Sequence, residues 1–139
     1  MKIDGACLCG HITYEAEIDP ARVAICHCTD CQTGSASAFR FGVLVPKDRF
    51  RLLSGTPKVY VKTAESGHPR ALSFCPECGT SLHGADPVDP RWYSLRLGTS
   101  RQRAELVPTV QIWCRSALPW LSGLESIRKV ETQGKVPGR

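Results

Sequence analysis

Eight cysteines in a chain of 139 residues are the strongest constraint on how this protein can fold. Seven of them form three tight groups, and Cys114 stands alone. The groups are Cys7-Leu8-Cys9-Gly10, Cys26-His27-Cys28-Thr29-Asp30-Cys31 and Cys75-Pro76-Glu77-Cys78-Gly79. A reducing compartment keeps thiols from pairing into disulfides, so this density of cysteine indicates metal binding. The sequence therefore predicts a fold organised around metal ions.

The spacing within each group suits zinc. A Cys-x-x-Cys turn lets two sulfurs reach one ion at a Zn–S distance of about 2.3 Å, and a following glycine lets the backbone fold around the metal. A Cys-x-Cys pair on an extended segment presents both sulfurs on the same face. Seven sulfurs divide into four, which close a structural site, and three, which leave a position for water or substrate. We expect two zinc ions per chain.

The spacing alone leaves the pairing of the groups open. One alternative is a zinc ribbon with Cys28, Cys31, Cys75 and Cys78 as its ligands, which leaves the other three grouped cysteines over. Disulfide bonds, or a single structural zinc with spare thiols, are also compatible with the pattern.

The remaining sequence has the pattern of a β protein. Between Ile12 and Ile18, apolar residues alternate with polar ones, which is typical of a strand with one wet face. Runs rich in β-branched and aromatic residues predict further strands at residues 23–25, 39–45, 50–53, 58–62, 71–74, 92–97 and 110–113. The 10 prolines and 12 glycines leave no room for a long amphipathic helix. We expect one mainly β domain over residues 1–130, a short helix after Cys28, and a loose tail over residues 131–139.

Charge and hydropathy limit the partners. The formal net charge is +5, but seven thiolates on two Zn²⁺ ions would lower it to about +2. Without a dense Lys/Arg run, nucleic acid is not an expected partner. No apolar run approaches the roughly 18 residues of a membrane helix, and the chain does not start with an apolar signal segment. We therefore expect a cytoplasmic protein that does not bind a membrane.

The order of the motifs resembles that of a known family. Cys-x-Cys-Gly, Cys-His-Cys-x-x-Cys and Phe-Cys-x-x-Cys-Gly, followed by Ile112-Trp113 and Leu118-Pro119-Trp120-Leu121, resemble the glutathione-dependent formaldehyde-activating enzymes, a family that includes the centromere-associated protein V. The resemblance implies a zinc-stabilised β-tent of the Mss4-like type. It also implies two sets of zinc ligands, which are Cys7, Cys9, Cys75 and Cys78 for a structural zinc and Cys26, Cys28 and Cys31 for a catalytic zinc.

The resemblance implies a carbon–sulfur lyase similar to S-(hydroxymethyl)glutathione synthase. A small thiol such as glutathione would take the open position of the three-cysteine zinc and add to formaldehyde or a related aldehyde. Three thiolates make zinc a weak Lewis acid but keep a bound sulfur nucleophilic, which favours sulfur transfer over water activation. The alternative is a zinc-stabilised binding module for protein or chromatin, in which both metals serve only the fold.

Residues outside the cysteine groups offer few further candidates. Glutathione carries two carboxylates, so its pocket should offer cations. The cations on or next to predicted strands are Arg40, Lys62, Arg70 and Arg96. His27 lies between two cysteines, but on an extended segment it should point away from both, so we name no general acid.

Other residues have structural expectations. We expect Trp92, Trp113 and Trp120 to lie chiefly in the core. Cys114 is expected to be a small buried apolar residue, and His83 to be exposed or hydrogen-bonded. Gln111 stands where members of the family often have histidine.

Overall fold

The computed structural model describes residues 1–134, which form two β-sheets, one α-helix and several short 3₁₀ segments. The smaller sheet is antiparallel and has the strand order β1-β2-β5. Its strands are β1 (Lys2–Ala6), β2 (Thr13–Glu17) and β5 (Phe50–Ser54).

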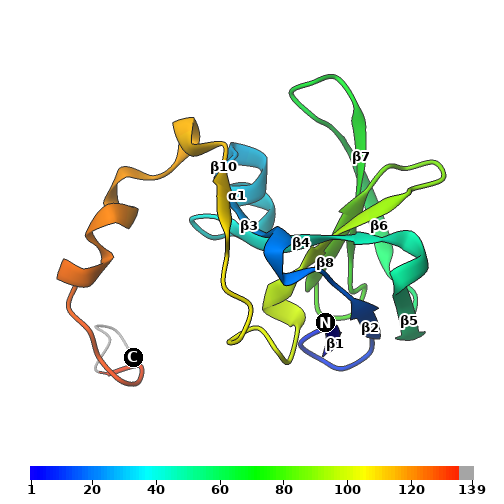
Figure 1. Ribbon diagram of the computed structural model, residues 1–139, viewed down its shortest axis with the longest axis horizontal. Helices are drawn as coiled ribbons and strands as arrows, with labels where there is room; N and C mark the ends of the chain where they lie inside the picture. The colour runs from blue at the N-terminus through cyan, green and yellow to red at the C-terminus, as the bar shows by residue number, and fades with distance from the viewer. Residues whose placement is uncertain (135–139) are drawn as a thin grey trace.

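The larger sheet has seven strands in the order β10-β3-β4-β9-β8-β7-β6 (Figure 1). Its neighbouring strands are antiparallel except for β10 and β3, which run parallel. The strands are β3 (Val23–Cys26), β4 (Arg40–Pro46), β6 (Lys58–Thr63), β7 (Pro69–Phe74), β8 (Ser81–Ala85), β9 (Trp92–Arg96) and β10 (Val110–Ile112).

The helical elements are short. The α-helix, α1 (Thr29–Ser35), follows the central cysteine group directly. The 3₁₀ segments are η1 (Pro20–Arg22), η2 (Lys47–Arg49), η3 (Leu97–Thr99), η4 (Cys114–Ser116) and η5 (Pro119–Ser126). Within residues 1–134, no helix is long and apolar enough to span a membrane.

The main core lies between the two sheets. In β2 and its flanks, Tyr14, Ala16 and Ile18 are buried, while Glu15 and Glu17 are exposed, as the alternating pattern predicts. Buried residues of both sheets and of nearby loops complete this cluster, which contains Ile3, Tyr14, Ala16, Ile18, Val23, Val43, Val45, Leu95, Leu97 and Leu106. The sheets are therefore joined by apolar burial.

These features confirm a mainly β single domain with one short helix after Cys28. Each predicted strand overlaps an observed one, but β1 and β8 were not predicted. The domain boundary at residue 130 stays a prediction, and the part of the expected tail over residues 135–139 lies outside the described residues.

After η4 the chain leaves the sheets. The C-terminal arm, residues 118–134, runs away from the body of the molecule (Figure 1). The segment η5 within it has no buried residue. Trp120 is 52% exposed, and Trp92 and Trp113 are 41% and 42% exposed. The expectation that the tryptophans lie in the core was therefore wrong.

Candidate metal centre

Four cysteines from the two ends of the sequence pattern meet in one cluster. The Sγ atoms of Cys7, Cys9, Cys75 and Cys78 all lie within 4.8 Å of one another. The Sγ–Sγ distance is 3.6 Å between Cys7 and Cys9 and 3.8 Å between Cys9 and Cys75. Sulfurs held at about 2.3 Å from a tetrahedral zinc ion lie about 3.8 Å apart. Both the ligand type and the spacing therefore fit zinc.

Two tight turns shape this cluster. In the first, the Gly10 N–H donates to the carbonyl oxygen of Cys7 at 3.0 Å, and in the second the Gly79 N–H donates to that of Cys75 at 2.9 Å. Both glycines have positive φ, at +79° and +75°, which side chains disfavour. Cys9 therefore lies in a turn and not on the extended segment that its spacing suggested.

The four-cysteine cluster is part of a small core. Cys7 and Cys75 are buried, and they pack with Ile12 and Leu82, with Cys78 at the edge. The N–H of Ile12 also donates to the Sγ of Cys7 at 3.2 Å. A metal bound here would therefore join the first turn of the chain to the β7–β8 connection.

Three cysteines form a separate cluster. The Sγ atoms of Cys26, Cys28 and Cys31 lie within 4.8 Å of one another. Cys26 ends β3, Cys28 is the N-cap of α1, and the Cys31 N–H donates to the Sγ of Cys28 at 3.3 Å. No fourth His, Cys, Asp or Glu of residues 1–134 joins this group. The structure thus brings the grouped sulfurs together as four and three, and the ribbon alternative does not form.

The thiols of each cluster titrate unequally. Burial and the neighbouring thiols of Cys28 and Cys26 raise the pKa of Cys31 to about 12, although the charge of Arg40 opposes this. In the other cluster, hydrogen bonds from the side chain and backbone of Thr80 lower the pKa of Cys78 to about 5. Thiolates crowded together repel one another, so a cation is needed to hold all of them ionised.

His27 is anchored by hydrogen bonds at its ring and backbone, although the Nδ1 atom of the ring is buried without a partner. Its ring is buried, and Nε2 lies 2.8 Å from the Oε1 of Gln111. Its backbone N–H donates to the carbonyl oxygen of Ile112 at 3.0 Å, and the side chain of Gln32 joins the carbonyl oxygens of His27 and Ser116. The segment from β10 to η4 therefore supports the three-cysteine cluster. Sequence reasoning missed Gln111 as the partner of His27, because the two residues lie 84 positions apart in the chain.

The four candidate cations share one face of the larger sheet. Directly paired residues of antiparallel strands point to the same side. Cys26 pairs with Arg40, and Arg96 pairs with Gly42, two residues further along β4. Across the sheet, Lys62 pairs with Arg70 on β6 and β7. The residue pairs that connect β7 to β8 and β8 to β9 place Lys62 and Arg70 on the same side of the sheet as Arg96. The cations thus lie on the sheet face that carries Cys26.

A cleft opens on this face. A small cavity of about 60 Å³ reaches Cys31, and an adjoining hollow of about 560 Å³ extends to Gly79 and Thr80 beside the other cluster. We call their shared part the arginine cleft, and its lining residues are Gly34, Ser35, Arg40, Ser81 and Arg96. Through Cys31, the three-cysteine cluster is therefore open to a molecule that enters between α1 and the sheet.

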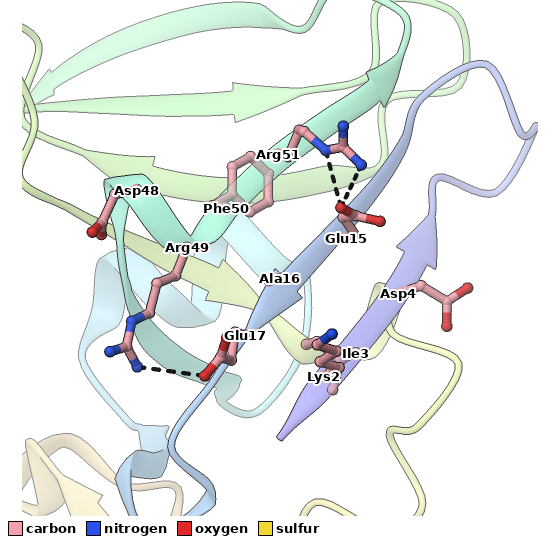
Figure 2. A pocket seen from close by; sticks show the side chains of 10 residues that line it. All are labelled: Lys2, Ile3, Asp4, Glu15, Ala16, Glu17, Asp48, Arg49, Phe50 and Arg51. Atoms are coloured by element: carbon pink, nitrogen blue, oxygen red, sulfur yellow. Dashed lines mark hydrogen bonds and ion pairs between the residues drawn. The ribbon is translucent and has the colours of Figure 1, made fainter.

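A second hollow, of about 460 Å³, lies over the smaller sheet (Figure 2). Two ion pairs lie across it, since Arg51 lies 2.6 Å from Glu15 and Arg49 lies 3.8 Å from Glu17. None of the cysteines lines it. It offers no reactive group and is not the candidate site.

Two other expectations were wrong. His83 is only 7% exposed, and its ring packs at 4.5 Å from that of Tyr93 and 5.4 Å from that of Phe50. Burial and the charge of Arg96 lower its pKa to about 4. Cys114 is exposed instead of buried. Neither residue belongs to a cysteine cluster.

Comparison with known proteins agrees with the geometry. The sequence profile of the family described as glutathione-dependent formaldehyde-activating enzyme matches residues 2–116, which include all seven clustered cysteines. A crystal structure of a Rhodobacter sphaeroides protein superposes with a TM-score of 0.60 and 18% sequence identity. The match covers 78% of this chain and 98% of that chain, and it shows a likeness of fold. No curated protein matches the chain. Because the profile spans most of the sequence, the chain belongs to the family of glutathione-dependent formaldehyde-activating enzymes.

Proposed function

We propose that this protein is a zinc-dependent carbon–sulfur lyase that joins a small thiol such as glutathione to formaldehyde or a related aldehyde. The observation that carries the proposal is the unequal division of the seven sulfurs, four in one cluster and three in the other. Four thiolates complete the coordination of zinc, whereas three leave one position for a ligand. We assign Cys7, Cys9, Cys75 and Cys78 to a structural zinc and Cys26, Cys28 and Cys31 to a catalytic one.

The reaction is an addition of the thiol to the aldehyde, and it needs no oxidant or reductant. The S–H bond of the thiol breaks, a bond forms between sulfur and the aldehyde carbon, and the proton reaches the aldehyde oxygen to give S-(hydroxymethyl)glutathione. A zinc ion at the three-cysteine cluster would supply a coordination position that favours the thiolate form of the substrate. We also propose that the protein works in the cytoplasm, because its cysteines are all free and a reducing compartment keeps thiols available to zinc.

The chain's own residues would hold and shield this chemistry. Cys28 and Cys31 are partly exposed, and Cys31 lines the cavity through which the thiol would enter, whereas Cys26 is buried at the end of β3. The hydrogen bond between His27 and Gln111 fixes the backbone between Cys26 and Cys28. Because that ring is already hydrogen-bonded to Gln111, we expect the proton to move through water and not through His27.

The proposal predicts two zinc ions per chain and a change at one of them on thiol binding. X-ray absorption at the zinc edge, with and without glutathione, should show the average number of sulfur neighbours rising when glutathione is added. An unchanged sulfur shell, or a single zinc with Cys26, Cys28 and Cys31 open to alkylation, would leave only the structural binding module.

Serine variants separate the two clusters. Cys75 is fully buried in the small core, so C75S should lose zinc and unfold the domain. C28S should keep the fold but lose the rise in sulfur neighbours and the acceleration of S-(hydroxymethyl)glutathione formation over the uncatalysed rate. C114S is the matched control, since Cys114 is exposed outside both clusters. Its replacement should change neither the stability of the fold nor the response to the thiol. Equal destabilisation by C28S and C75S would contradict the assignment.

A further inference from the structure

The cations beside the three-cysteine cluster are not equivalent. Lys62 forms an ion pair with Asp30, and Arg70 lies 2.7 Å from the carboxylate of Asp86. Among residues 1–134, neither Arg40 nor Arg96 has a carboxylate partner. Both line the arginine cleft. The cleft therefore holds two guanidinium groups whose charge no protein carboxylate offsets.

The protein positions these two side chains through one serine. Nη1 of Arg40 donates to the hydroxyl of Ser94, and Nη1 of Arg96 lies 3.3 Å from both the hydroxyl and the carbonyl oxygen of Ser94. Nε of Arg40 is buried and has no hydrogen-bond partner. Much of the donor capacity of the pair is therefore unused.

Two glycines make room for the guanidinium groups. A Cβ atom at Gly42 would lie 3.3 Å from Nη1 of Arg40, and one at Gly84 would lie 3.3 Å from Nη2 of Arg96. Both contacts are tighter than normal van der Waals packing, so a side chain would shift each guanidinium group by a few tenths of an ångström, and one at Gly42 would also meet the carbonyl oxygen of Leu95 at 2.6 Å. The two guanidinium groups thus lie against glycines of β4 and β8, on the sheet face that carries Cys26.

The pair holds its charge against an electrostatic cost. Burial and the charge of Arg40 lower the pKa of Arg96 to about 10, so Arg96 remains charged at neutral pH. Three cysteine thiolates around one Zn²⁺ would carry a net charge of about −1. Before the thiol loses its proton, that charge balances one guanidinium group and leaves one positive charge for the carboxylate of an incoming substrate. A carboxylate is the complementary partner, because it can accept parallel hydrogen bonds from a guanidinium group.

We propose that Arg40 and Arg96 bind a carboxylate of the thiol substrate, which makes carboxylate-bearing thiols the substrate class of this protein. The inference rests on the proposed function, since it places the thiol at the three-cysteine cluster. In this arrangement the cysteines receive the sulfur end of the substrate and the arginine cleft receives its carboxylate end. Neutral and cationic thiols of the same size bind more weakly.

The test uses full-length protein loaded with Co²⁺, whose sulfur-to-metal absorption reports thiol binding without catalysis. The probes are 3-mercaptopropionate, 2-mercaptoethanol and cysteamine, which are similar in size but carry a negative, no and a positive charge. With allowance for their different thiol pKa values, the anionic probe should bind about 10-fold or more tightly than the neutral one. Cysteamine should bind most weakly. Equal binding of all three would overturn the inference and leave the proposed function intact.

Variants connect the preference to the arginines. R96Q and R40Q should each reduce the preference for 3-mercaptopropionate towards parity with little effect on 2-mercaptoethanol, while R96K should retain part of it. R49Q is the matched control, because Arg49 lies over the smaller sheet, and it should preserve the full preference. A preference that survives R96Q and R40Q would overturn the inference.

The two proposals fail in different ways. If none of the three probes changes the cobalt spectrum, the three-cysteine cluster does not receive thiols, and the proposed function and the inference fail together. If R96Q or R40Q does not fold, the comparison of probes on the unaltered protein still tests the preference for a carboxylate, and R96K, which keeps the positive charge, tests whether Arg96 is its source.

Discussion

His83 follows the last cysteine group closely in the sequence, yet its ring is surrounded by aromatic side chains and not by sulfur. Phe50 and Tyr93 pack their rings against it, and Nδ1 is buried without a hydrogen-bond partner. Arg96 adds a positive charge nearby, so protonation is disfavoured twice, by burial and by repulsion. His83 is therefore neutral in the folded protein.

This environment predicts a pH-dependent stability. The pKa of His83 falls from 6.5 to about 4 on folding, so below pH 6.5 the unfolded chain takes up the proton first. The free energy of unfolding should therefore decrease as the pH falls from 6.5 to 4, by about 3 kcal/mol from this group. Urea denaturation of zinc-loaded protein across this range should show a shallower pH dependence for H83F.

The matched control is H68F, because His68 is exposed and its replacement should leave the slope unchanged. An H83F variant with the slope of the unaltered protein would show that the pKa of His83 does not fall on folding.

At this scale the cysteines were predictable and the residues around them were not. Residue type and spacing indicate zinc ligands, because thiolates separated by one or two residues can converge on one ion within a local turn. Arg40 and Arg96 lie close together, and His27 contacts Gln111, only because of the strand register, which local sequence does not specify. His83 was misjudged because a ring packed among aromatic residues leaves no local signal.

Among the elements, β1 depends on a glycine that local propensity disfavours. A Cβ atom on Gly5 would overlap the hydroxyl of Tyr14 and lie 2.5 Å from the carbonyl oxygen of Thr99. Neither neighbour can move freely, since Tyr14 is buried and Thr99 belongs to η3. The strand therefore requires glycine for close approach to β2 and η3.

We expect G5A to reduce the free energy of unfolding by about 1–3 kcal/mol through overpacking. Urea denaturation measures this directly. G123A serves as control, because no atom lies within 4 Å of a Cβ at Gly123, and it should change stability by less than about 0.5 kcal/mol. If G5A matches G123A, the contact with Tyr14 is not constraining.

The same argument explains which strands the sequence revealed. β2 was predictable because its alternation of apolar and charged residues is a local pattern. β8, with the sequence Ser81-Leu82-His83-Gly84-Ala85, has weak strand propensity and is buried along most of its length. It is a strand because β7 and β9 flank it on both sides, and that is a property of the whole sheet.

For the whole molecule, the C-terminal arm is the segment least connected to the body. Its backbone hydrogen bonds are local, such as those from Leu121 to Leu118 and from Ile127 to Leu124. The preceding segment is attached, since the Ser116 carbonyl accepts from Gln32 and Arg115 lies 3.0 Å from Glu65. The arm thus contributes little to the fold of a single chain.

A chain that ends after residue 117 should therefore unfold within about 2 °C of the full-length protein by calorimetry. A chain that ends after residue 108 also lacks β10, and it should lose both stability and the zinc of the three-cysteine cluster. A large loss of stability in the chain that ends after residue 117 would show that the arm belongs to the folded domain, as the predicted boundary at residue 130 supposes.

The parallel pairing of β10 with β3 also has a consequence for the order of assembly on the ribosome. Every ligand of the four-cysteine cluster has been synthesised once Cys78 emerges, so its metal can be captured by a nascent chain. The supports of the other cluster, from Gln111 to Ser116, are translated later. The three-cysteine cluster is thus completed last, when the four-cysteine cluster that stabilises the other end of the fold already exists.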